Sequence, residues 1–110
     1  MIINPEGSTV VLIQEKLSTP EFVKQLEEKY DSFKNNHIIV QLSSLKNNEA
    51  ENISDFLRIS KAHKAKKQSF VLVSGELTYN DVPEELSLVP TLQEARDIIA
   101  MEDIERDLDL

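Results

Sequence analysis

The stretch that decides the fold begins His37-Ile-Ile-Val-Gln-Leu42 and continues Ser43-Ser-Leu-Lys-Asn-Asn48, ahead of a helical pattern that extends to Lys67. The first part is almost continuously apolar, as in a strand that is buried on both faces of a parallel sheet. A polar turn without glycine follows at once. The helix after this turn would bury one face, which is made by Ala50, Ile53, Phe56, Leu57 and Ser60. A strand, a turn and a helix in this order predict one crossover unit of an α/β sheet.

The segment before this unit predicts a hairpin and a first helix. The short apolar runs at 1–4 and 9–14 predict two strands, and Gly7 lies in the tight turn between them. Ser18-Thr-Pro-Glu21 forms a capping box with a proline in the first turn, so we expect a helix to begin there and to end at Asn35-Asn36. The buried face of this helix would carry Phe22, Val23, Leu26, Tyr30 and Phe33.

The segment after the unit predicts two further strands and a last helix. Ser69-Phe-Val-Leu-Val-Ser74 is the least ambiguous strand of the sequence, and residues 75–85 then carry turn residues. Residues 86–89 predict a short edge strand. A helix capped within 90–94 would follow, with inward-facing side chains from Leu92, Ala95, Ile98, Ile99, Met101 and Ile104.

These elements predict an α/β fold with the order β-β-α-β-α-β-(β)-α. The second, third and fourth strands would pair in parallel through right-handed crossovers, and the hairpin makes the small sheet mixed but mainly parallel. Amphipathic helices would pack on it. A length of 110 residues supports one domain with a modest core, so we expect a single domain over residues 1–110.

Composition excludes several classes of protein. The chain has no cysteine, so it can form no disulfide framework and no thiolate zinc site. The first residues lack the basic region and the long apolar stretch of a signal peptide. No apolar run approaches the roughly 18 residues that a membrane helix needs. We therefore expect a soluble cytoplasmic protein with no membrane partner.

Charge is unevenly distributed along the chain, whose net charge is −8. Residues 94–110 hold seven acids and only two arginines, whereas residues 58–67 hold five basic residues and no acid. An acidic protein repels phosphate backbones, so nucleic acid is a poor partner. The basic cluster is best explained as the solvated end of a helix, where cations favour the negative end of the helix dipole. The acidic end keeps Met101, Ile104 and Leu108 at helical spacing, as in a docked helix or a segment that engages a partner.

No group of reactive residues predicts catalysis. His37 and His63 stand without the spacing of a metal-binding motif, so we interpret both as structural or surface residues. The chain shows no nucleophile elbow, phosphate loop or paired-carboxylate pattern. We expect a protein that is not an enzyme and that needs no metal and no cofactor.

Three pieces of the sequence resemble the STAS domain family, the fold of bacterial anti-sigma-factor antagonists and of the cytoplasmic ends of sulfate transporters. The first is Gly7-Ser-Thr-Val-Val-Leu-Ile13 followed by the capped helix start at 18–21. The second is Ile38-Ile-Val-Gln-Leu-Ser-Ser-Leu45, similar to the family's strand that ends in an Asp-Leu-Ser type sequence. The third is Phe70-Val-Leu-Val73 with Val89-Pro-Thr-Leu-Gln-Glu-Ala95, like the family's terminal strand and helix start. The resemblance spans nearly the whole chain and implies a regulatory protein.

Regulatory members of this family carry an Asp-Ser-Ser/Thr-Gly pattern before the second helix, and a partner kinase phosphorylates a serine there. Aligned on the strands, Glu49 takes the place of the aspartate and Ala50 that of the serine. Alanine cannot accept a phosphoryl group, so the family's switch is missing at this position. Glu49 and Glu51 could imitate a permanent phosphate, but acids at a helix start are also ordinary, because they are favourable there by roughly 0.3–1 kcal/mol.

The resemblance implies a non-catalytic adaptor that binds a protein partner, either an anti-sigma-like kinase or another regulator, without a phosphoserine switch. The sequence also leaves open whether the protein forms a homodimer. We expect the contact surface at the turn and helix start, at Ser43, Ser44, Asn47, Asn48, Glu49, Ala50, Glu51 and Ser54. The alternative is a binding module for a small anionic ligand or nucleotide at the amides of that helix start, which the two glutamates oppose.

Overall fold

The computed structural model describes residues 1–15, 17–42, 49–77, 80 and 82–108, and for residues 49–52 it describes the backbone. Five strands form one sheet in sequence order: β1 (Ile2–Glu6), β2 (Thr9–Ile13), β3 (His37–Gln41), β4 (Phe70–Val73) and β5 (Ser87–Val89). The β1–β2 pair is antiparallel and every other pair is parallel. The predicted α/β class, the element order and the mainly parallel sheet are confirmed, with β3 in the centre.

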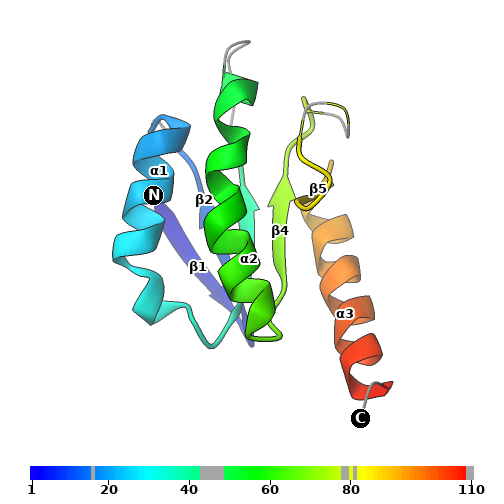
Figure 1. Ribbon diagram of the computed structural model, residues 1–110. Helices are drawn as coiled ribbons and strands as arrows, with labels where there is room; N and C mark the ends of the chain where they lie inside the picture. Colours follow the sequence, from blue (N-terminus) through cyan, green and yellow to red (C-terminus); the bar gives the residue numbers. More distant parts are fainter. Residues whose placement is uncertain (16, 43–48, 78–79, 81, 109–110) are drawn as a thin grey trace.

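Helices cover both faces of this sheet (Figure 1). α1 (Thr19–Glu28), the short 3-10 helix η1 (Tyr30–Ser32), the 3-10 helix η2 (Glu49–Phe56) and α2 (Leu57–Ala65) pack on one face. α3 (Leu92–Leu108) packs alone on the other. The buried apolar residues accordingly divide into two clusters, one on each side of the strands. Among the described residues, no helix combines the length and the apolarity that crossing a bilayer requires.

The hairpin and the first helix begin as predicted. Gly7 has φ +61°, the left-handed conformation that a tight hairpin turn requires and that glycine adopts without strain. Ser18 caps α1, because its Oγ accepts a hydrogen bond from the amide of Glu21 at 3.4 Å. The prediction that this helix continues to Asn35-Asn36 was wrong, because α1 ends at Glu28 and η1 follows. The tighter turn keeps Phe33 in the core, where it is 4% exposed.

The second helix also differs from the prediction. A regular α-helix from about Asn48 was expected, whereas the chain forms a 3-10 helix up to Phe56 and turns α-helical only at Leu57. Its sequence Glu-Ala-Glu-Asn-Ile-Ser-Asp-Phe includes Ser54 and Asp55, residue types that compete for backbone hydrogen bonds and disfavour the α-helix. Eight residues are long for a 3-10 helix, so the packing of its buried side chains must hold it.

The last helix contradicts the prediction over its C-terminal half. Ala95 and Ile99 are buried as expected, but Met101 and Ile104, which were expected to point inward, are 55% and 60% exposed. The reason lies in the helical period. The positions that continue the buried face below Ile99 carry polar residues, so the apolar residues between them point to solvent.

These polar residues attach α3 to the sheet through a polar docking cluster, formed by His37, Ser69, Glu102, Asp103 and Arg106. The Ser69 hydroxyl donates to Glu102 Oε1 at 2.5 Å and accepts from Arg106 at 2.8 Å. The Ser69 amide donates to His37 Nδ1 at 2.9 Å, so the ring proton is on Nε2, which faces Asp103 Oδ1 at 3.1 Å. Arg106 also donates to Asp103 at 2.8 Å. The cluster satisfies the buried polar groups of Ser69 and His37.

His63 was interpreted as either a structural or a surface residue. It is structural, because its side chain is fully buried. Its Nε2 donates to the Asn36 carbonyl at 2.7 Å, because a carbonyl can only accept, and its Nδ1 accepts from the Tyr30 hydroxyl at 2.6 Å. The ring also packs edge-on against Phe70 at a centroid distance of 6.3 Å. His63 thus joins α2 to η1 and to β4.

We expect His63 to make the fold less stable in mild acid. Burial lowers its pKa from the ordinary 6.5, and the positive charge of Lys66 lowers it further, although the Asn36 carbonyl opposes the shift. As the pH falls below 6.5, the unfolded chain takes up a proton that the folded chain does not, so the free energy of unfolding falls until the folded pKa is reached. Urea titrations at several pH values check this. His63→Gln, which does not titrate, should lose this part of the pH dependence, and an unchanged slope would contradict the assignment.

Lys67 holds a strained conformation just after α2. Its φ is +64°, in the left-handed region that glycine usually occupies at this position after a helix. We expect Lys67→Gly to raise the free energy of unfolding by about 1 kcal/mol, because a side chain costs roughly that much there. Lys67→Ala is the matched control, since it removes the same charge and keeps the strain. Thermal or urea unfolding should show a gain for glycine alone, and an equal gain for alanine would point to charge instead.

Candidate functional site

A groove runs along the surface between α1 and the η2–α2 segment. We call it the α1–η2 groove. One wall comes from the exposed side of α1 and the other from the end of η2 and the first turn of α2. Its lining consists of Pro20, Val23, Lys24, Glu27, Glu28, Ser54, Asp55, Leu57 and Arg58. Figure 1 shows the two helices on the same face of the sheet.

Buried aromatic packing fixes the two walls relative to each other. Phe56, at the junction of η2 and α2, is fully buried. Its ring lies 6.1 Å from that of Phe22 on α1 and 6.2 Å from that of Phe70 on β4, between centroids. Ile53 is also fully buried on the inner side of η2. The backbone of the groove therefore rests on a packed core, which favours a surface that is preformed for binding.

Charges of both signs and a few apolar side chains line the groove together. Arg58 of α2 bridges to Glu27 of α1, and this ion pair spans the groove. Lys24 adds a second cation, while Glu28 and Asp55 add acids. Val23 and Leu57 supply the apolar part. A mixture of apolar and charged side chains is the usual composition of a protein-binding surface.

The predicted contact residues have different outcomes. Ser54 lies in the groove and is exposed. Glu49, Ala50 and Glu51 lie on the first turn of η2, which leads into the groove wall. The remaining four predicted residues fall outside the described part of the chain: Ser43, Ser44, Asn47 and Asn48. The part of the predicted surface that the structure describes thus adjoins the groove.

Sequence reasoning missed the α1 wall and Arg58. Arg58 was assigned only to a solvated basic cluster, and Lys24 and Glu27 were not singled out. No local pattern marks these residues, because the groove depends on which helices become neighbours on the sheet. The Glu27–Arg58 pair joins residues that are distant in sequence, and only the fold brings them together.

The polar docking cluster contains a serine, a histidine and an aspartate, but it is not arranged for nucleophilic catalysis. The Ser69 hydroxyl is bonded to Glu102 and Arg106, and only its amide reaches His37. Ser69 is also fully buried, so a substrate cannot approach its hydroxyl. Within the described residues, no group of three or more histidine and acidic side chains is placed to hold a metal ion. The role we assign to the cluster is to attach α3.

Comparison with models of known protein families gave no match for this chain, and comparison with curated proteins gave none either. The STAS resemblance therefore rests on the sequence pieces quoted above and stays a prediction.

Proposed function

We propose that this protein is a non-catalytic regulatory adaptor of the bacterial cytoplasm, which binds a protein partner through the α1–η2 groove. It resembles anti-sigma-factor antagonists, and the partner we expect is an anti-sigma-like kinase or another regulator. Ala50 stands where regulatory relatives would carry the phosphorylated serine, so the binding would be controlled by something other than phosphorylation there.

The observation that carries the proposal is the composition and placement of the groove. It combines apolar side chains with charges of both signs, and it adjoins the helix start where the resemblance places partner recognition. The charged residues are ordinary surface residues on two rigidly packed helices. Such a surface suits recognition of a complementary protein surface more than bond chemistry, because nothing in it is arranged to activate a nucleophile.

The anionic-ligand alternative has weaker support. The helix start at which such a ligand would bind is a 3-10 helix, whose amides are less regularly aligned than those of an α-helix. The groove beside it holds the acids Glu27, Glu28 and Asp55 against the cations Lys24 and Arg58. An anion would meet more acid than base there.

Affinity capture with a charge reversal tests the proposal. Immobilised wild type, Arg58→Glu and Lys34→Glu are exposed to lysate of the source organism, and the bound proteins are quantified by mass spectrometry. Lys34 is the matched control, because it is exposed, carries the same charge and lies outside the groove lining. We expect wild type and Lys34→Glu to enrich the same protein about tenfold or more over Arg58→Glu, since reversing a contact charge costs at least 1.4 kcal/mol. Equal capture by all three would refute the groove as the site.

The capture result would not reflect unfolding. The side chain of Arg58 is 81% exposed, and an ion pair this exposed contributes about 1 kcal/mol or less to stability. Circular dichroism of the variant should therefore match that of wild type.

A further inference from the structure

The outer side of α3 carries a stripe of exposed apolar residues, which we call the α3 stripe. Met101, Ile104 and Leu108 are 55%, 60% and 81% exposed, and their spacing of three and four places them on one side of the helix. That side lies opposite Ala95 and Ile99, which face the sheet. Apolar residues at this spacing are what a helix presents to a packing partner. We therefore treat the α3 stripe as a docking surface for another molecule.

Charges beside the α3 stripe restrict what this occupant can be. Glu105 and Asp107 lie on its two flanks and both are exposed, and Asp97 lies one turn before Met101. Two α3 helices facing each other would bring these like charges together. An anionic membrane surface would be repelled in the same way. The occupant should offer an apolar recess with a cationic border.

The chain itself offers such a recess on the other face of the sheet. Between α1 and α2 lies a small hollow, the α1–α2 hollow, lined by Glu27, Tyr30, Arg58, Ile59 and Ala62. Apart from the Glu27–Arg58 pair, its lining is aromatic and aliphatic. It is thus an apolar recess into which a large aliphatic side chain can insert.

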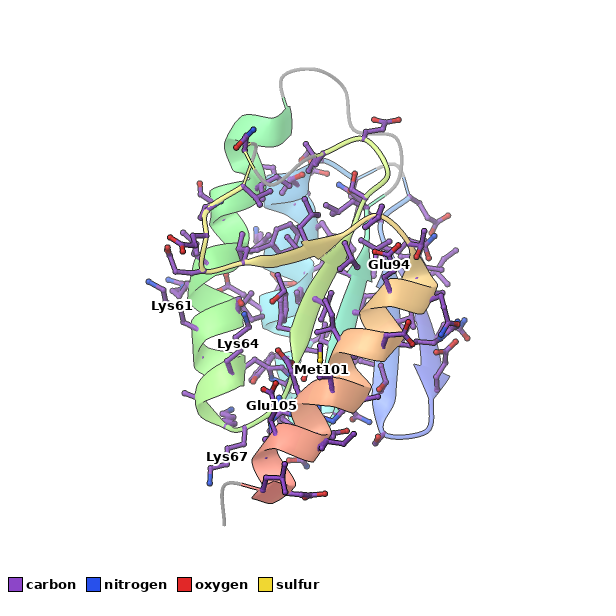
Figure 2. The ribbon with its side chains drawn as sticks, turned by 90° about the vertical axis from the view of Figure 1, so that its right-hand side faces the viewer. Lys61, Lys64, Lys67, Glu94, Met101 and Glu105 are labelled. Atoms are coloured by element: carbon purple, nitrogen blue, oxygen red, sulfur yellow. The ribbon has the colours of Figure 1, made fainter. Side chains whose placement is uncertain are left out.

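Cations border this hollow. The Lys66 ammonium lies 4.6 Å from the centre of the Tyr30 ring. The Arg58 side chain is paired with Glu27 but is 81% exposed, so it is also accessible to an acid on a docked chain. Figure 2 shows Lys61, Lys64 and Lys67 on the α2 side of the molecule and Met101 and Glu105 on the α3 side. One chain thus presents an apolar stripe with acidic flanks on α3 and, in a different place, an apolar hollow with the cations Arg58 and Lys66 at its border.

We propose that the α3 stripe of one copy docks into the α1–α2 hollow of a second copy. The two surfaces lie on opposite faces of the sheet, so a copy can dock onto one neighbour while it receives another. Such a head-to-tail contact builds a ring or an open chain of copies. The acids that flank the stripe meet the basic border of the hollow, which makes the contact weaken as salt rises. The hollow shares Glu27 and Arg58 with the α1–η2 groove, so a docked copy would compete with the proposed partner. The inference itself concerns the purified chain alone and is tested without that partner.

Sedimentation velocity of the purified full chain tests the docking. From about 5 to about 500 µM, at low salt, the weight-average sedimentation coefficient of wild type should rise with concentration, and the rise should diminish at about 0.5 M salt. Ile104→Glu removes the stripe and Ala62→Glu places an acid in the hollow, so each should weaken association at least tenfold. Ile2→Glu is the matched control, because Ile2 is a 45% exposed isoleucine on β1, and it should associate as wild type does.

Mixing the two disrupted variants gives the decisive result. Ile104→Glu keeps an intact hollow and Ala62→Glu keeps an intact stripe, so an equimolar mixture should form dimers and nothing larger, although each variant alone stays monomeric. A mixture that stays monomeric would overturn the proposal. So would a wild type that stays monomeric throughout, or a loss of association in Ile104→Glu without a loss in Ala62→Glu. In the last case, the stripe would pair with another surface.

Discussion

Replacing Phe56 with alanine is expected to lower the free energy of unfolding by about 3–5 kcal/mol, the usual cost of removing a buried phenylalanine ring. The ring is fully buried and contacts the rings of Phe22 and Phe70, so it connects η2 to α1 and to the sheet at once. Its loss would leave a cavity and remove two edge-on or tilted aromatic contacts. Urea unfolding followed by circular dichroism measures the change.

Phe56→Leu is the control for this prediction. Leucine fills much of the same space, so we expect a loss below about 1.5 kcal/mol. Hydrogen exchange should also show faster exchange of the η2 amides in Phe56→Ala than in Phe56→Leu, because η2 depends on this contact for its position. A loss under about 1 kcal/mol for Phe56→Ala would contradict the role of the ring in holding the groove wall.

Replacing His37 with alanine is expected to lower the free energy of unfolding by about 2–3 kcal/mol, because the buried Ser69 amide loses its acceptor. The side chain of His37 is 9% exposed and connects Ser69, which directly precedes β4, to Asp103 of α3. The same substitution removes the donor that faces Asp103. The C-terminal half of α3 should therefore separate from the sheet more readily.

His37→Asn separates the hydrogen bond from the packing. The amide oxygen of asparagine can occupy the place of Nδ1 and accept from the Ser69 amide, so we expect about half of the loss to be recovered. Urea unfolding gives the stabilities, and hydrogen exchange of the α3 amides shows where the change acts. If alanine and asparagine were equally destabilising, the Ser69 hydrogen bond would not be the main contribution of His37.

Local patterns were sufficient to predict most elements of the fold. The short apolar run at 38–42, which a polar turn follows, is typical of a buried strand. β3 forms there, in the centre of the sheet. Gly7 and the Ser18 cap predict the hairpin turn and the start of α1, because each acts through its own backbone neighbours. The helix ends were less predictable, since η1 and η2 follow from tertiary packing that overrides helical periodicity.

The inward face of α3 could not be predicted from apolar spacing alone. Met101 and Ile104 match a helical stripe as well as Ile99 does, and the stripe that becomes buried depends on polar partners elsewhere. Those partners are His37, the first residue of β3, and Ser69, which directly precedes β4; both contact residues in the last turns of α3. The sequence shows these polar residues, but it does not show which of them contact one another in the fold.

The candidate site was only partly predictable for the same reason. The resemblance placed the expected contact surface at the turn and start of the second helix, and Ser54 does lie in the groove. The opposite wall comes from α1, and its proximity to Arg58 appears only when both helices pack on one sheet face. A site formed by two elements distant in sequence leaves no local signal when neither contributes a reactive group.

Photo-crosslinking in cells of the source organism tests the central proposal most directly. A photoreactive amino acid is placed at Ser54 or Lys24 in the groove and, as a control, at Ser32 in η1, all of which are exposed. If the groove binds a protein partner, both groove positions should crosslink one and the same protein other than this chain itself, and the Ser32 position should not crosslink that protein. Groove positions that yield no crosslinked protein, or the same products as Ser32, would contradict an adaptor that acts through this groove.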